Sequence, residues 1–171
     1  MNGHRPIFWN QGLFLHPQHF QAADEELRRH IAPLRIYGLP YFWGVRRLVW
    51  RAFAPDHSLT VESLEAIFPS GAVVNVPYDA SLAPFSLRGD WPEPDKPGTL
   101  LLGLALPKAD GNNAAPEGEF AGVRFVYAET PEQMPDVYGD SPAAPVHRLR
   151  YAPVLIKDAD LGKYPDFETL P

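Results

Sequence analysis

The chain has 171 residues, a net charge of −6, 45% hydrophobic residues, 21% charged residues and no cysteine. This size and composition fit one globular domain with its own core, and the lack of cysteine excludes disulfides, thiolate metal sites and a cysteine nucleophile. The 20 prolines and 13 glycines exclude an all-helical bundle and favour short strands joined by many turns, because proline interrupts helices and central strands.

Residues 6–15 contain two short apolar runs on either side of Gly12. This pattern predicts a short strand, a turn at residues 10–12 and a second short strand. A helix is predicted at about 17–31, because Pro17 suits a first helical position and apolar residues then recur every three or four positions. Pro33 is expected to end this helix. We predict that Phe14 and Phe20 are core residues that fix the helix on a sheet.

The rest of the chain is predicted to be β-structure. Alternation over 41–52 changes phase at residues 46–47, which indicates a bulge, and 59–78 forms a hairpin around the turn at 69–71. Residues 79–98 are expected to form a long loop with one short strand, 100–106 a strand buried on both faces, and 123–127 a further strand. A second proline-rich loop is predicted at 130–145, and a last strand at 149–156 interrupted by Pro153. Together these patterns predict a mainly β fold, a β-sandwich of roughly seven or eight strands with one early helix, over a single domain 1–171.

Charge is unevenly distributed along the chain. Residues 1–51 carry a net charge of +4 and the remaining residues −10. The acidic surface argues against nucleic-acid binding, because it repels phosphate. The basic first third either docks on an acidic partner, docks on the acidic remainder of the same chain, or is simply a solvated face. No apolar run is long enough to span a membrane and no secretory leader is recognisable, so we expect a cytoplasmic protein without direct membrane insertion.

No motif of a known catalytic or cofactor site is present. His16 and His19 have the spacing of a metal pair, but no third ligand accompanies them, and a structural or surface role is the simpler interpretation. The nucleophile elbow, the phosphate-binding loop, the dinucleotide fingerprint and the zinc-protease motif are all missing from the sequence. We therefore predict a protein that is not an enzyme and has no catalytic residue, no cofactor and no metal.

The N-terminal segment from Trp9 to Gln21, followed by Asp24, strongly resembles the opening of the TssK family, the baseplate component of the bacterial type VI secretion system. The residues that carry the resemblance are Trp9, Gly12, Leu13, Phe14, Leu15, Pro17, Gln18, His19, Phe20, Gln21 and Asp24. Weaker landmarks extend along the chain, among them the turn at 68–71. Two positions depart from the family pattern: Gln11 stands where Glu is usual, and Ser70 stands where Asp is common.

The resemblance implies a structural adaptor. Its fold is expected to be similar to the shoulder domain of siphophage receptor-binding proteins, and its partners are expected to be the baseplate wedge proteins TssF and TssG. Family members are longer, so this chain is expected to be the N-terminal shell domain without the neck and the C-terminal head. The absent part is expected to reach the inner-membrane complex through TssL and TssM, and the whole protein is expected to be a trimer. The motif residues are expected to serve structure or assembly.

Two rival functions remain open at this stage. The first is a phage-tail-like carbohydrate-binding module, for which Trp43, Trp50 and Trp91 offer aromatic stacking surfaces. The second is an enzyme with a dispersed histidine site. For the adaptor function, the proline-rich segments 84–98 and 131–145 are candidate contact loops, because proline lowers the entropy lost when a loop is ordered in an interface.

Overall fold

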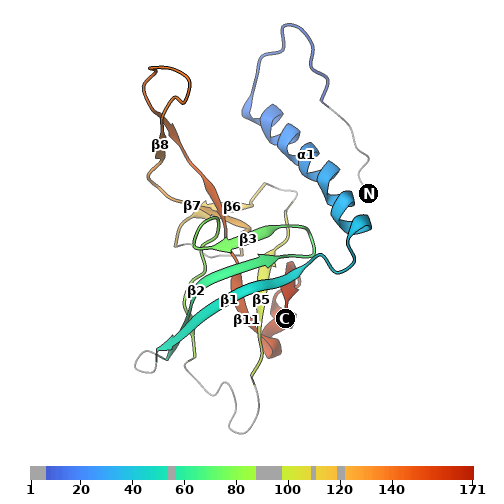
Figure 1. Cartoon of the computed structure of the whole chain (residues 1–171), viewed down its shortest axis with the longest axis vertical. Helices are drawn as coiled ribbons and strands as arrows, with labels where there is room; N and C mark the ends of the chain where they lie inside the picture. The colour runs from blue at the N-terminus through green and yellow to red at the C-terminus, as the bar shows by residue number, and fades with distance from the viewer. Residues whose placement is uncertain (1–6, 54–56, 88–97, 109–110, 119–121) are drawn as a thin grey trace. The chain divides into compact units, whose positions relative to one another are not determined.

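The computed structural model describes residues 7–53, 57–87, 98–108, 111–118 and 122–171. The chain divides into two compact units, Met1–Phe42 and Trp43–Pro171. It is mainly β with one long helix, as predicted. In chain order the elements are α1 (Pro17–Gly38), β1 (Gly44–Phe53), β2 (Ser58–Ile67), β3 (Val73–Val76), β4 (Phe85–Ser86), β5 (Leu100–Ala105), β6 (Ala114–Pro116), β7 (Phe125–Tyr127), β8 (Glu132–Met134), β9 (Ala144–Val146), β10 (Leu149–Tyr151), β11 (Val154–Lys157), the 3-10 helix η1 (Asp158–Lys163) and β12 (Phe167–Leu170) (Figure 1).

The first unit begins with a turn rather than with strands. The predicted turn is confirmed, because the Leu13 amide donates to the Asn10 carbonyl at 3.3 Å. Gly12 adopts φ +85°, a conformation that a residue with a Cβ rarely tolerates. The two predicted strands on either side of it are not formed over residues 7–16. None of the strands that the structure describes is paired with this segment, and a single strand without a partner has no ladder to stabilise it.

Helix α1 is longer than predicted and contains Pro33. The expectation that this proline ends the helix is wrong. A proline removes one amide donor, here the partner of the Arg29 carbonyl, but water can satisfy that carbonyl because Arg29 and its surroundings are exposed. The helix ends at Gly38, and the Leu39 amide donates to the Arg35 carbonyl at 3.1 Å. Within the described part of the chain, no helix has the length and hydropathy needed to cross a membrane.

In the second unit, β1, β2 and β3 lie side by side as an antiparallel sheet, and the short β4 pairs with the start of β2 (Figure 1). The predicted bulge in β1 is confirmed by a register shift between Val45 and Arg47. The predicted hairpin is also confirmed. Its turn closes where the Gly71 amide donates to the Phe68 carbonyl at 2.8 Å, with Gly71 at φ +85°.

A second antiparallel sheet has the order β11–β5–β12 and packs against the first. The central strand β5 is buried from Leu102 to Ala105, which confirms the prediction of a strand covered on both faces. Both sheets contribute to one core, as expected for a sandwich. Its buried residues are Val61, Leu64, Ala66, Phe68, Ala72, Val74, Val76, Ala80, Leu102, Leu104 and Leu170.

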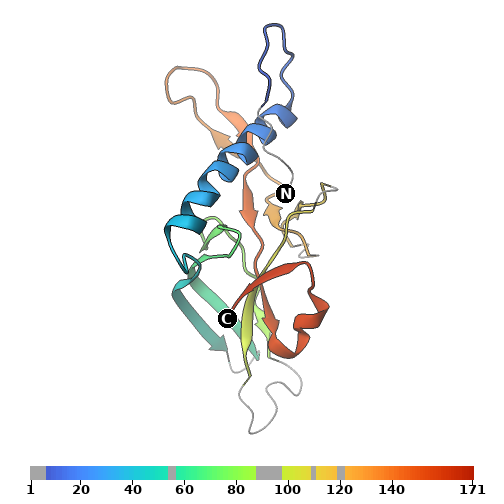
Figure 2. The same ribbon diagram turned by 90° about the vertical axis from the view of Figure 1, so that its right-hand side faces the viewer.

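Two smaller sheets complete the unit. One has the order β10–β7–β6, and the other is the hairpin of β8 and β9. The hairpin corrects the sequence prediction, which treated 130–145 as one loop. It projects from the rest of the Trp43–Pro171 unit in both views (Figures 1 and 2). The described residues contain twelve strands, more than the predicted seven or eight, because several strands are only two or three residues long.

Candidate interaction surface

The N-terminal motif mainly builds the start of α1. Pro17 occupies the first helical turn, where its missing amide donor costs nothing. The His19 ring nitrogen Nδ1 accepts a hydrogen bond from the His16 backbone amide at 2.9 Å. Farther along the helix, Arg28 donates to the Asp24 carboxylate at 3.3 Å. These local contacts explain why the motif has these residue types: they form the turn and the start of the helix.

Aromatic rings of the motif gather around the same helix start. The rings of Phe14 and His16 stand edge to face at 5.2 Å, and those of Trp9 and His19 lie 6.2 Å apart. The prediction that Phe14 and Phe20 are core residues is wrong, because their side chains are 78% and 59% exposed. The other motif residues are exposed except the half-buried Leu13 and His19; these exposed residues are Trp9, Gly12, Leu15, Pro17, Gln18, Gln21 and Asp24.

The described part of the chain contains no assembled metal site. His16 and His19 do come together, with ring centroids 5.9 Å apart. The Nδ1 atom of His19 is already an acceptor for a backbone amide. Among the described residues, no group of three or more His, Asp or Glu side chains is placed to hold a metal ion.

A polar groove lies on the outer face of the first sheet, lined by side chains of β1, β2 and β3 and by Tyr78. Two carboxylates line it, and both are engaged in ion pairs: Glu62 with Arg51 at 3.0 Å and Glu65 with Arg46 at 3.4 Å. The lining residues include Ser63 but no histidine, so they do not contain a serine–histidine pair.

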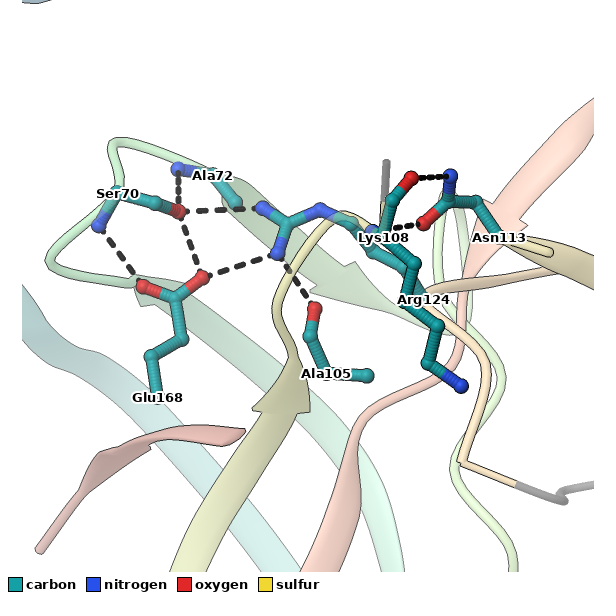
Figure 3. A network of polar contacts seen from close by, with 7 residues as sticks. All are labelled: Ser70, Ala72, Ala105, Lys108, Asn113, Arg124 and Glu168. Atoms are coloured by element: carbon teal, nitrogen blue, oxygen red, sulfur yellow. Dashed lines mark hydrogen bonds and ion pairs between the residues drawn. The ribbon is translucent and has the colours of Figure 1, made fainter. Parts of the chain in front are cut away.

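A buried ion pair lies at the edge of the sandwich core. Arg124 and Glu168 are 3.1 Å apart, and their side chains are only 7% and 8% exposed (Figure 3). Arg124 also donates to the Ala105 carbonyl at 2.7 Å and to the Ser70 hydroxyl at 3.1 Å. Its guanidinium lies 5.6 Å from the centre of the Tyr151 ring. Every charge is paired and hydrogen-bonded, which is the condition for burying such groups.

Ser70 ties the first hairpin turn to this pair. Its backbone amide and hydroxyl both donate to Glu168, at 2.8 and 2.6 Å (Figure 3). An ionised aspartate at this position has no hydroxyl to donate and would add a second negative charge beside Glu168. The departure from the family pattern at Ser70 therefore suits the buried carboxylate of this chain. The network joins β12 to the turn before β3 and to the start of β7.

The tip of the β8–β9 hairpin is a turn that exposes two large side chains, Val137 and Tyr138. One carboxylate oxygen of Asp136 accepts hydrogen bonds from the backbone amides of Tyr138 at 2.9 Å and Gly139 at 3.0 Å. These donors, the Tyr138 amide first, together with the hydroxyl of Ser141, lower the pKa of the Asp136 carboxyl below its ordinary value. The turn leaves Val137 81% exposed and Tyr138 fully exposed.

The base of the hairpin is held by side chains. Arg148 donates to the Glu132 carboxylate at 2.5 Å, and a ring nitrogen of His147 lies 3.1 Å from the Ala128 carbonyl. Sequence reasoning singled out the segment 131–145 but not its exposed tyrosine. The available signal was the sequence Asp-Val-Tyr-Gly, because an Asp followed closely by Gly is typical of a turn capped by its own side chain.

The three tryptophans proposed as stacking surfaces are not gathered in the described part of the structure. Trp43 and Trp50 are 42% and 55% exposed; Trp43 comes just before β1, and Trp50 lies in the second half of that strand. Trp91 lies outside the described residues, as does the stretch 88–97 of the other predicted contact loop.

Comparisons with known proteins agree with the motif resemblance. Residues 19–171 match the family described as "Bacterial Type VI secretion, VC_A0110, EvfL, ImpJ, VasE". The type VI secretion system baseplate component TssK1 of Pseudomonas aeruginosa is 30% identical over 96% of this chain, and the chain spans 37% of that relative's length.

Solved structures share the fold. The chain is similar to a crystal structure of TssK, with a TM-score of 0.78, 18% identity and coverage of 98% of this chain and 37% of the other. It is also similar to a chain in a structure of the type VI secretion TssK–TssF–TssG baseplate subcomplex, with a TM-score of 0.79, 20% identity and coverage of 98% and 54%.

Proposed function

Because this chain belongs to the TssK family of bacterial type VI secretion proteins, we propose that it is the part of a TssK protein that docks onto the baseplate wedge of TssF and TssG. In this proposal it is a structural adaptor rather than an enzyme. The solved subcomplex supports the choice of partners, because a chain of the same fold is there part of a TssK–TssF–TssG assembly.

The observation that carries the proposal is the tip of the β8–β9 hairpin. Tyrosine is enriched among the residues that dominate interface energies, since it offers a large rigid surface and a polar end. Tyr138 is fully exposed beside Val137, and the Asp136 turn fixes both before any partner binds. A contact that is already ordered loses little conformational entropy on binding.

The N-terminal motif supplies a second surface in this proposal. Exposed Trp9, Phe14 and Phe20 lie beside a helix start whose backbone is fixed by the turn and by His19. Exposed aromatic residues on an ordered frame suit an assembly contact. We assign the motif to assembly as well as to local structure.

The remaining roles follow the same proposal for the whole protein. In the same proposal the whole protein is a trimer and is cytoplasmic, and its C-terminal part, outside this chain, links the baseplate to the inner-membrane complex through TssL and TssM. No described observation favours the carbohydrate-binding alternative, since Trp43 and Trp50 do not form one platform.

The test is co-purification of the full chain with TssF and TssG from the same organism. The proposal expects a stable complex of the folded chain with the wedge. A folded chain that does not co-purify with TssF and TssG, or that binds a glycan array instead, would overturn it.

A further inference from the structure

Strand β1 is an open edge of the first sheet. Among the described residues it pairs only with β2, along the register from Gly44 and Ile67 to Phe53 and Ser58. Its other edge therefore presents backbone donors and acceptors that no described strand engages. Such an edge is a template for one more strand, and proteins usually shorten, cover or charge it. With ten residues, β1 is as long as any of the described strands.

The core face of the sheet continues onto β1 without being covered. Cross-strand partners share a face, and Val45, Leu48 and Trp50 lie opposite Ala66, Leu64 and Val61, which are all buried. Yet Val45, Leu48 and Trp50 are themselves 40%, 51% and 55% exposed. The apolar layer of the sandwich thus extends past the area that the second sheet protects.

The opposite face of β1 is basic. Arg47 lies opposite Glu65 and Arg51 opposite Thr60, on the outward side of the sheet, and Arg46 occupies the bulge. The strand Gly44–Phe53 contains three arginines and no acidic residue. Arg46 and Arg51 form ion pairs with Glu65 and Glu62 of β2, so the charge that a strand added at the free edge would meet is chiefly that of Arg47.

We propose that β1 binds an extended partner segment in which acidic and apolar residues alternate. Such a segment adds a strand to the sheet, lays its apolar side chains beside Leu48 and Trp50 and sets a carboxylate beside Arg47. Opposite charges on adjacent strands stabilise the pair, whereas like charges facing each other destabilise it.

A second copy of the chain does not fit the same edge. Antiparallel pairing of β1 with itself about its centre places Arg46 or Arg47 opposite Arg51. Repulsion between these arginines disfavours self-pairing of β1, and the same positive charge favours pairing with an acidic strand.

The test uses the full chain and a synthetic peptide that alternates Glu with Val and Leu over the length of β1. Amide hydrogen exchange is measured residue by residue with this peptide and with its Lys-for-Glu counterpart. The proposal expects slower exchange in β1 with the acidic peptide and no change with the basic one. Arg47→Glu should weaken binding of the acidic peptide about five- to tenfold. The control Lys108→Glu, at an exposed position away from β1, should leave it unchanged.

Unchanged exchange in β1 at saturating acidic peptide would overturn the proposal. Equal protection by the basic peptide would do so too, as would a concentration-dependent dimer of the chain alone with protected β1 amides. The assay contains neither TssF nor TssG, so its outcome is independent of the docking proposed above.

Discussion

Arg124 and Glu168, which lie 44 positions apart in the chain, form a buried ion pair that closes the edge of the sandwich. Removing one partner leaves an uncompensated charge on a side chain that is less than a tenth exposed. We expect Glu168→Ala to lower the free energy of unfolding by about 3–5 kcal/mol. The double change Arg124→Met with Glu168→Leu should recover most of that loss. Chemical denaturation of the wild type and the two variants measures both values, and a Glu168→Ala chain as stable as the wild type would contradict this description.

Ser70 offers a sharper change in the same network. Ser70→Asp replaces a hydroxyl donor to Glu168 by a second carboxylate, so both donation and charge balance are lost. We expect Ser70→Asp to be more destabilising than Ser70→Ala, which removes the hydroxyl without adding charge. Thermal melts of the two variants decide the order. If the melting temperature of Ser70→Asp equals or exceeds that of Ser70→Ala, the Ser70 hydroxyl does not serve as the donor to Glu168 described here.

The exposure of Phe20 reverses a sequence-based expectation. Phe20 is 59% exposed and Phe68 is fully buried, so the two phenylalanines form a matched pair. Phe20→Ala should change the free energy of unfolding by less than about 1 kcal/mol, whereas Phe68→Ala should cost about 3–5 kcal/mol. Equilibrium denaturation measures both. Equal losses of unfolding free energy in the two variants would show that Phe20 is a core residue after all.

The Asp136 turn should depend on pH. The pKa of its carboxyl is lowered from the ordinary 3.8, mainly by the Tyr138 amide, so the charged form is the one the folded turn favours. The stabilisation of the folded turn by the Asp136 carboxylate is therefore fully present above the ordinary pKa. It is lost as the pH falls through the lowered pKa. We expect the Tyr138 and Gly139 amide resonances to shift in this acidic range. In Asp136→Asn, whose amide does not titrate, that shift should vanish; if it persists, another group causes it.

The sequence predicted those parts of the fold whose signals are local. Alternation over β2 and β3 and the glycine at position 71 define a hairpin without help from the rest of the chain. The end of α1 was misjudged because the effect of Pro33 depends on how exposed the helix is, which no local pattern states. Likewise, the pairing of Arg124 with Glu168 requires β12 to lie beside β5, and the exposure of Tyr138 requires the hairpin to project.

The measurement that tests the account most directly is the affinity of the chain for the TssF–TssG wedge with and without Tyr138. Tyr138→Ala should weaken binding by about 2 kcal/mol or more, roughly thirtyfold, while leaving the melting temperature unchanged. Tyr78→Ala is the matched control, because Tyr78 is 85% exposed in the same unit but lies on the outer groove. We predict that only Tyr138→Ala loses affinity. Wedge binding that is equally tight in the wild type and in Tyr138→Ala would contradict it.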